Sequence, residues 1–568
     1  MSDQDESVWV VFNGEIYNFP ELKRELQSHG HVFRTNCDTE VIVHGYKQWG
    51  DEVLNRLNGM FGLAIWDVRQ RRLVLARDPF GIKMIYYRIG GGTLYFGSEM
   101  RAIRAGMPGN ADIDATSLSL FLRYRFTPAP YTILKELKKL APGTKLTVQN
   151  GVCTVSRYYR FRPQPFTPAK SPSEAKEQLL SLYKAAIKRQ LISDVPVGLL
   201  LSGGIDSGLL LALMNLNGNS WPTYTVGYGT SFADDELADA EETARVLGSK
   251  HSSVTISQAT FEEALPKIVA TLEEPIATSS IVPMYFVCQR AHQDVKVALV
   301  GQGPDELFGG YPRHLGVRYG PMWASLPQWL RNPIASTVAA LPRNETLKRG
   351  VNALAISDRM RRYQHVLSLL PGDQVEGLFH DGLLTPEASD TILNCWKDMS
   401  ELMTETDELG GLQFLEVRST LPDELLMYAD KLSMAHGLEL RVPFVDKEIV
   451  EYVERLPARM KVRNGSRKWL HRQVCRAFLP ESIVKRPKRG FASNVVDDWF
   501  RGAIDSKMAD TLLNKGSRIY QYLRPQAVRE LFEQHAAGQN DNHKVLFSLA
   551  VFEEWLRTYE EPVVSLSR

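Results

Sequence analysis

The sequence Ser-Gly-Gly-Ile-Asp-Ser at residues 202–207 has the residue types and spacing of a phosphate-binding turn. It follows the apolar run 196–201 and precedes the apolar run 208–212, which predicts a buried strand, a glycine turn and a helix. Such a turn leaves backbone N–H groups free at a helix N-terminus, where they bind anions. The serine hydroxyls add donors, and Asp206 can hold a cation against a bound phosphate. No Gly-Lys-Ser/Thr follows, so the Walker pattern is excluded. The alternative is a plain turn that uses Gly for its conformation and Ser as a cap.

The elements around this turn alternate between strands and helices. The expected strands are 197–201, 223–227, 253–256 and 295–300. The expected helices are 205–214 and about 235–247. This alternation predicts a parallel α/β sheet of the doubly wound type, whose ligands bind at the carboxyl ends of the strands. A second glycine-rich block, Gly301–Tyr311, begins where a strand ends, and its glycines allow the backbone to approach a phosphate closely. The alternative for this block is a connecting loop without a ligand.

The N-terminal part of the chain, residues 8 to about 160, is β-rich with intervening helices. The expected elements are strands at 8–12, 61–66, 72–77, 84–87 and 93–97, with a helix at 20–29. This pattern indicates a layered α+β domain with antiparallel sheets. The proline-dense stretch 161–172 predicts a linker that ends in a helix N-cap and first turn, 171–174. The expected domains are therefore 1–160 and 173–568, and the second becomes mostly helical from about residue 320.

Composition and charge exclude several classes of protein. Among the 568 residues, 44% are hydrophobic and 23% are charged, and the net charge of +1 favours neither a nucleic-acid nor an acidic-membrane partner. The five cysteines are spread along the chain without a CxxC pair, so disulfides and structural zinc are not expected and a reducing cytoplasm fits. The first residues are acidic, unlike a signal peptide, and no apolar run has the length of a membrane span.

An Asn-Gly pair occurs in the segment Phe12–Asn18, directly after the first expected strand. Taken alone, this pair is the strongest two-residue hairpin signal and predicts a type I′ turn. Its companions change that interpretation, and they are the segments 37–42, 57–62, 77–83 and 97–99. In this order and spacing the segments resemble the glutaminase domain of class II glutamine amidotransferases, in the asparagine synthetase branch.

That resemblance implies a glutamine site. Asn13 and Gly14 match the residues that donate hydrogen bonds to the oxyanion hole, which acyl transfer requires. Glu15 and Asp38 match the acids that hold the amino group of glutamine. The sequence departs from the family because the N-terminal nucleophilic cysteine and the arginine segment that binds the glutamine carboxylate are missing. Cys37 cannot replace that cysteine because its amine is part of a peptide bond. We expect either that Met1 is an internal methionine of a longer protein, which we favour, or that glutaminase activity has been lost.

The resemblance to asparagine synthetases continues through the rest of the chain and covers nearly all 568 residues. The 202–207 turn resembles the PP-loop of ATP pyrophosphatases, which split ATP between its α and β phosphates. Further matching blocks are 193–198, 223–227, 301–311, 421–446 and 486–491. The ATP-binding residues that the resemblance implies are Leu201, Ser202, Gly203, Gly204, Asp206, Ser207, Val226, Val300 and Gly301.

The same resemblance implies catalytic roles for Asp206, Asp305 and Lys488. The two aspartates would hold Mg²⁺, since two carboxylates and a polyphosphate are the usual ligands of this ion. Lys488 would steady the pyrophosphate and the charged intermediate, or it could be one of a solvated basic run. Gln302 departs from the family, which often has Asp or Glu there. A neutral Gln cannot take a proton, so the general base and the acceptor substrate stay open.

The implied reaction is the ATP-dependent conversion of aspartate to asparagine through a β-aspartyl-AMP intermediate, with release of AMP and pyrophosphate. The nitrogen would come from glutamine in a full-length protein or from ammonia in this chain, and a homodimer is common in the family. A related amidotransferase or β-lactam-type synthetase acting on another carboxylic acid is the alternative within enzymes. A catalytically silent regulatory or binding subunit is the alternative outside them.

Overall fold

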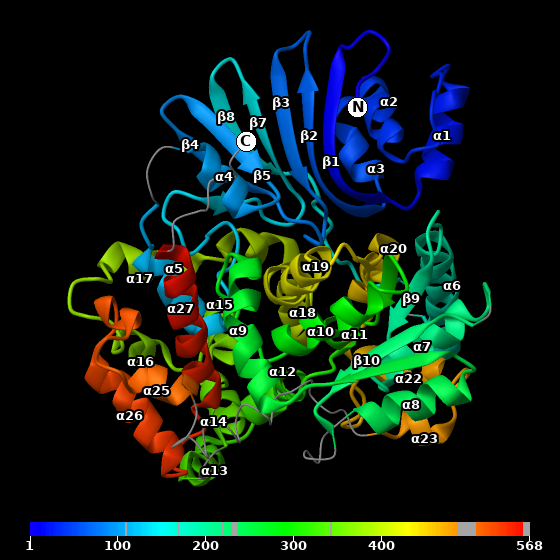
Figure 1. Ribbon diagram of the computed structural model, residues 1–568. Helices are drawn as coiled ribbons and strands as arrows, with labels where there is room; N and C mark the ends of the chain where they lie inside the picture. Colours follow the sequence, from blue (N-terminus) through cyan, green and yellow to red (C-terminus); the bar gives the residue numbers. More distant parts are fainter. Residues whose placement is uncertain are drawn as a thin grey trace.

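A computed structural model of the chain describes residues 1–107, 111–167, 170–218, 220–229, 236–340, 344–486 and 507–560. An N-terminal region of antiparallel sheets, residues 1–157, lies on a larger C-terminal region, from residue 172 onwards, that holds a parallel sheet and most of the helices (Figure 1). The five cysteines are all free, as their spacing predicts. None of the described helices has both the length and the apolar composition that crossing a bilayer requires.

The N-terminal region contains two antiparallel sheets. The larger has the order β1 (Val8–Ile16), β2 (Gly59–Asp67), β3 (Arg72–Arg77), β7 (Thr144–Gln149) and β8 (Val152–Arg157). The smaller has the order β5 (Thr93–Gly97), β4 (Tyr86–Gly90) and β6 (Lys138–Lys139). The surrounding helices are α1 (Phe19–Ser28), α2 (Thr39–Trp49), η1 (Gly50–Glu52), α3 (Val53–Arg56), α4 (Met100–Gly106) and α5 (Ala115–Tyr124). The expected β2–β3 and β4–β5 pairs are confirmed.

The Asn-Gly pair is not a hairpin turn. Asn13 and Gly14 lie inside strand β1, where they pair with Gly62 and Phe61 of β2. A Cβ atom on Gly14 would lie 2.0 Å from the carbonyl oxygen of Met60, so only glycine allows β1 and β2 to approach here. The pairing of β1 with β2 along its whole length therefore outweighs the local preference of Asn-Gly for a hairpin turn.

The C-terminal region is built on a parallel sheet in the order β11 (His251–Thr255), β10 (Thr223–Gly227), β9 (Val197–Leu200), β12 (Val297–Val300) and β13 (Glu439–Arg441). In chain order this arrangement is 3-2-1-4-5, which is a doubly wound sheet, as the alternating pattern predicts. The direction of winding reverses between β9 and β12, and these two strands pair in register from Val197 opposite Val297 to Leu200 opposite Val300. Ligand sites of such sheets lie at this switch point.

Helices surround this sheet. The first ones are α6 (Pro172–Gln190), α7 (Ile205–Met214), α8 (Leu237–Val246), α9 (Gln258–Leu272), α10 (Ile281–Ala291), α11 (Pro304–Phe308), α12 (Pro312–Ala324), α13 (Gln328–Ala340) and α14 (Glu345–Ala353). The middle ones are α15 (Arg359–Leu367), α16 (Gly372–Glu376), α17 (Pro386–Asn394), η3 (Lys397–Met403), α18 (Glu408–Arg418), η4 (Leu421–Leu426), α19 (Met427–Met434), η5 (Pro443–Val445) and α20 (Lys447–Glu454). The last ones are α21 (Ala458–Lys461), α22 (Trp469–Cys475), α23 (Glu481–Val484), α25 (Lys507–Leu513), η7 (Arg518–Gln521), α26 (Pro525–Ala536) and α27 (His543–Glu560). Helix α6 begins with the expected cap, a reciprocal capping box between Ser171 and Glu174.

The two regions share one apolar core. Phe80, Tyr86 and Phe121 of the N-terminal region belong to the same buried cluster as Leu199 and Leu299 of the parallel sheet. A separate core lies where α1 and α2 cover one face of the larger antiparallel sheet. Because apolar burial continues across the junction, the N-terminal sheets are held against the C-terminal region rather than tethered by the linker alone.

Three buried ion pairs across the junction have their cation on the N-terminal side. They are Arg77–Asp423 at 3.3 Å, Lys83–Asp430 at 2.6 Å and Lys139–Glu274 at 3.1 Å. Lys139 and Glu274 are almost completely buried, and the hydroxyl of Tyr86 also donates to Glu274. Such pairs set how the two regions fit, because removal of one partner leaves an uncompensated buried charge.

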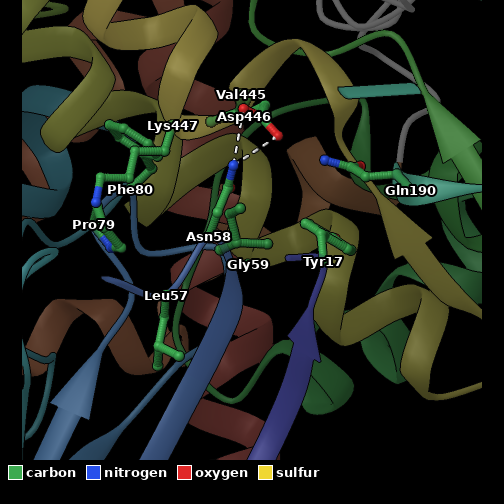
Figure 2. A pocket seen from close by; sticks show the side chains of 11 residues that line it. Tyr17, Leu57, Asn58, Gly59, Pro79, Phe80, Gln190, Val445, Asp446 and Lys447 are labelled. Atoms are coloured by element: carbon green, nitrogen blue, oxygen red, sulfur yellow. Dashed lines mark hydrogen bonds between the residues drawn. The ribbon is translucent and has the colours of Figure 1, made fainter. Parts of the chain in front are cut away.

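A small polar cavity of about 10 Å³ lies at the same junction (Figure 2). Asn58 of the N-terminal region reaches across it and donates to both carboxylate oxygens of Asp446, each at 3.3 Å. The hydroxyl of Tyr17 and Oε1 of Gln190 also line this cavity, and neither has a hydrogen-bond partner among the described residues. The volume is that of about one water molecule, which these four polar groups are suited to bind.

We predict that Lys139→Met lowers the free energy of unfolding by about 3–5 kcal/mol, because Glu274 is left buried without its cation. Thermal and urea unfolding measure the change. The double variant Lys139→Met/Glu274→Gln is the control, since it removes the buried charge and keeps the acceptor for Tyr86, and it should recover most of the loss. A single variant as stable as the wild type would contradict the prediction.

Candidate active site

The two glycine-rich segments meet at the switch point of the parallel sheet. The 202–207 turn follows β9, and the 301–311 block follows β12, its neighbour in the sheet. A Cβ atom on Gly301 would lie 3.0 Å from the backbone nitrogen of Ser207, so the two loops are in close contact. Of the other residues expected to bind ATP, Val300 ends β12, and Val226 lies one residue before the end of β10 on the far side of β9. The structure thus brings these residues to one edge of the sheet.

The 202–207 turn is fixed by its own serines. The hydroxyl of Ser207 accepts from the backbone N–H of Ser202 at 3.2 Å and lies 3.1 Å from the Ser202 hydroxyl. Gly203 has a φ of +71°, and a Cβ atom there would lie 2.6 Å from the backbone nitrogen of Ala240. The N-cap of α7 is Gly204, and no side chain caps this helix end. The alternative that a serine acts as the cap is therefore wrong, and the first N–H groups of α7 are left for a ligand.

A buried lysine joins the two expected metal-binding aspartates. The ammonium of Lys468 lies 2.6 Å from Oδ2 of Asp206 and 2.8 Å from Oδ1 of Asp305. Burial by itself would raise the pKa of Asp206, but Lys468 and the nearby His471 hold this pKa well below its usual range. Conversely, the two carboxylates raise the pKa of Lys468 against the effect of its burial. Asp206 is therefore a carboxylate and Lys468 an ammonium ion at neutral pH.

A histidine and a tyrosine stand behind Asp206. Nε2 of His471 lies 3.0 Å from Oδ1 of Asp206, and its Nδ1 lies 2.8 Å from the hydroxyl of Tyr183. Both side chains are fully buried. Burial lowers the pKa of His471, and the hydrogen bond to Asp206 only partly offsets this effect. The imidazole is therefore neutral in the physiological pH range.

The donor set around Asp206 and Asp305 suits Mg²⁺ bound together with a polyphosphate. Both carboxylates contact one ammonium group, so they converge on a space of ionic dimensions. Among the described residues, no three His, Cys, Asp or Glu side chains form a metal cage. A cation held here would take its remaining ligands from phosphate oxygens or water, as Mg²⁺ commonly does.

Arg486 connects the 202–207 turn to the 486–491 block. Its guanidinium donates to the carbonyl oxygens of Gly203 and Asp239, each at 2.8 Å. It also pairs with Glu242 of α8. Lys488, the lysine that the sequence places in catalysis, lies outside the described residues.

The second glycine-rich loop carries an unpaired polar group. Gln302 directly follows Gly301, and its Oε1 atom is buried without a hydrogen-bond partner among the described residues. A carboxylate at this place would be charged and could take a proton, but the amide oxygen only accepts a hydrogen bond. This orphaned oxygen lies beside the loop that carries Asp305, so a donor on a substrate could satisfy it.

The residues expected to bind glutamine gather at the end of β1. Nδ2 of Asn13 donates to Oγ of Ser98 at 3.1 Å, and Oδ2 of Asp38 accepts from the backbone N–H of Ile16 at 2.8 Å. Glu15 lies 3.6 Å from the guanidinium of Arg441, which comes from β13 of the C-terminal region. Burial and the Asp38 carboxylate raise the pKa of Glu15 to about 7, although Arg441 opposes the shift.

The sequence analysis missed three candidate functional residues. Lys468 and His471 contact Asp206, and Arg441 contacts Glu15 across the junction of the two regions. Lys468 sits in the polar stretch 463–468 and looks like one more surface cation. Arg441 pairs with Glu439 at 2.7 Å, and both residues lie on strand β13, a short segment that completes the parallel sheet. Lys468 has an unusual φ of +52°, a signal that the sequence does not carry and only the backbone conformation reveals.

Comparisons with known proteins agree with the motifs. A family model described as asparagine synthase matches residues 178–557, and one described as a glutamine amidotransferase domain matches residues 1–159. Asparagine synthetase [glutamine-hydrolyzing] 1 of Bacillus subtilis is 31% identical over 98% of this chain and 86% of that relative. A putative asparagine synthetase of Mycobacterium tuberculosis is also 31% identical, over 97% of this chain and 84% of that relative. The asparagine synthetase of Gallus gallus is 26% identical, over 94% and 82%.

Among solved structures, a glutamine phosphoribosylpyrophosphate amidotransferase of B. subtilis aligns with a TM-score of 0.21 and 16% identity, over 46% of this chain and 52% of that chain. This likeness is too low to bear on the fold.

We predict that Glu15→Gln stabilises the protein in a pH-dependent way. An unfolded glutamate titrates near pH 4.5, whereas Glu15 in the folded protein titrates near pH 7. Between these values the folded state binds more protons, so the free energy of unfolding falls as the pH rises through this window. A neutral glutamine avoids this loss. The variant should therefore melt above the wild type at pH 8, and the difference should vanish as the pH falls to 4.5.

Calorimetry between pH 4.5 and 8 measures both proteins. Glu530→Gln, which changes an exposed glutamate of α26, is the matched control and should show no such pH-dependent difference. A stabilisation by Glu15→Gln that does not change with pH would contradict the prediction.

Proposed function

The chain belongs to the asparagine synthase family, as its motifs predict, and we propose that it converts the β-carboxylate of aspartate to the amide of asparagine with the energy of ATP. It is a ligase of the asparagine synthetase type. The observation that carries the proposal is the convergence of Asp206 and Asp305 on Lys468 at the switch point of the sheet. This place is where a doubly wound sheet binds its ligands, and the charges suit a magnesium polyphosphate.

ATP binds in this proposal with its phosphates on the 202–207 turn. Support comes from the N-terminus of α7, which no side chain caps and whose N–H groups suit an anion, and from the paired hydroxyls of Ser202 and Ser207. Val226, Val300 and Gly301 lie at the carboxyl ends of the neighbouring strands, beside this turn. Bound Mg²⁺, held by Asp206 and Asp305, would neutralise charge on the phosphates as it develops.

The acceptor carboxylate attacks the α-phosphorus, and the bond from this phosphorus to the bridging oxygen breaks, so pyrophosphate leaves. The loop N–H groups stabilise the negative charge on the leaving group. Lys468, already charged and buried beside both aspartates, adds a fixed positive charge to the same space. Ammonia then attacks the acyl carbon, AMP departs, and one proton is lost from the nitrogen. We assign Lys488 to the leaving pyrophosphate by its position in the family motif.

The nitrogen in the proposal comes from glutamine in a full-length protein or from ammonia in this chain. Asn13, Gly14, Glu15 and Asp38 form the proposed glutamine pocket of the N-terminal region. The side chains of Asn13, Glu15 and Asp38 lie near the end of β1, and Glu15 contacts Arg441 of the C-terminal region. We further propose that the protein is cytoplasmic and forms a homodimer.

One observation favours an acceptor acid other than aspartate. The orphaned Oε1 of Gln302 lies where a carboxylate would be expected in this family. An acceptor acid with a hydrogen-bond donor near its reacting carboxylate would satisfy this oxygen better than aspartate alone. Pyrophosphate release measured with ATP, Mg²⁺, ammonium and a panel of carboxylic acids separates the two candidates.

We predict that Asp206→Asn lowers ATP–pyrophosphate exchange in the presence of aspartate by at least ~100-fold, since it removes one of the two proposed metal carboxylates. Exchange is followed with labelled pyrophosphate, and circular dichroism confirms folding. Asp3→Asn is the matched control, because Asp3 is also buried and accepts from a lysine, Lys47, at 2.6 Å, yet lies in the N-terminal region. It should leave exchange unchanged. Full exchange by folded Asp206→Asn would overturn the assignment.

A further inference from the structure

We propose that His471, fixed by Tyr183, is a positioning residue that aims the Asp206 carboxylate and thereby sets how tightly the site binds its divalent cation. The inference rests on the proposed function only in that Asp206 is taken as a ligand of that cation. It concerns two residues, from α22 and α6, that the motifs of the sequence do not mark.

The hydrogen bonds determine which nitrogen of His471 carries the proton. The Tyr183 hydroxyl lies 2.8 Å from Nδ1, and the Asp206 carboxylate lies 3.0 Å from Nε2. A carboxylate only accepts hydrogen bonds, so Nε2 must be the protonated nitrogen. With Nε2 protonated, Nδ1 pairs with the Tyr183 hydroxyl, and the Nε2 proton faces the carboxylate of Asp206.

Packing prevents the imidazole from turning out of this arrangement. The ring centroids of Phe308 and Phe444 lie 5.4 Å and 5.7 Å from that of His471. Tyr183 packs edge-on against Phe444 with a centroid distance of 4.9 Å. Because His471 and Tyr183 are both fully buried, a flip of the ring would leave Nδ1 and the hydroxyl unsatisfied away from water.

The fixed position of His471 affects how Asp206 binds a cation. Lys468 contacts the other oxygen, Oδ2, but its charge competes with a metal ion for that oxygen. His471 is held by the surrounding rings and by Tyr183, so it can keep Oδ1 in place when a cation binds. Hydrogen-bond partners of metal-binding side chains typically change metal affinity 10–100-fold when they are removed. His471 therefore has this role toward Asp206, with Tyr183 behind it.

Three variants separate this role from simple packing. His471→Leu removes the donor and retains much of the volume, whereas His471→Gln restores a donor at the place of Nε2. Tyr183→Phe deletes a single oxygen atom and keeps the apolar core, so it tests the chain even if the leucine variant folds poorly. His535→Leu is the control, because His535 of α26 is also buried and lies outside the parallel sheet, where its Nδ1 accepts from the backbone N–H of Asn542.

The test is direct binding of Mn²⁺, used as a paramagnetic probe, in the presence of α,β-methylene-ATP. Electron paramagnetic resonance measures the free ion, so the readout does not depend on catalysis. We expect His471→Leu to raise the dissociation constant about 10–100-fold. His471→Gln should recover most of this loss, Tyr183→Phe should show a smaller loss in the same direction, and His535→Leu should bind like the wild type.

Two results overturn the inference. One is wild-type affinity in folded His471→Leu and Tyr183→Phe, and the other is a loss that glutamine does not recover. The proposed function is tested separately by ATP–pyrophosphate exchange of the wild type. Tight, His471-dependent binding without exchange would leave the inference standing and overturn the proposed function. A wild type that binds no Mn²⁺ with the nucleotide would overturn both.

Discussion

The Lys468 ammonium, buried between the carboxylates of Asp206 and Asp305, is the constraint on which the proposed active site depends. The two aspartates come from loops about 100 residues apart, since Asp206 follows β9 and Asp305 follows β12. Without a cation between them, these two buried charges would repel each other and would be costly to keep out of water. Lys468 relieves that repulsion, and it does so at the switch point where a doubly wound sheet binds ligands. The same ammonium thus organises the site and gives it the charge balance that a magnesium polyphosphate needs.

A second constraint is the junction between the N-terminal sheets and the C-terminal region. One apolar core crosses it, and buried cations of the N-terminal side meet carboxylates of the other side. Ion pairs of this kind contribute more to a defined arrangement than to net stability, because their desolvation offsets most of the attraction. Arg441 shows what the arrangement achieves, since a residue of the parallel sheet contacts Glu15 of the proposed glutamine pocket.

The local predictions that succeeded rest on short-range signals. Strand β10 and helix α7 have the predicted bounds, because a β-prone segment between Pro222 and Gly227 and a helix start after Gly203-Gly204 are encoded within a few residues. Asn13-Gly14 failed as a hairpin, since pairing over nine residues of β2 outweighs the preference of two residues. Strand β13 is only three residues long and exists because β12 offers it an edge. Nothing within residues 439–441 distinguishes it from the start of a turn.

The sequence by itself determined the chemistry that is available, which is a phosphate-binding turn with Asp206, a second glycine-rich loop with Asp305, and the order of motifs that indicates the family. Those features are contiguous, so spacing along the chain reveals them. Only the tertiary structure decided which distant groups act on that chemistry. Lys468, His471 and Tyr183 lie far from residue 206 in sequence, and each is an ordinary residue in its own segment. They become a single hydrogen-bonded unit because α6 and α22 pack beside the switch point and bury polar groups that must then pair with one another.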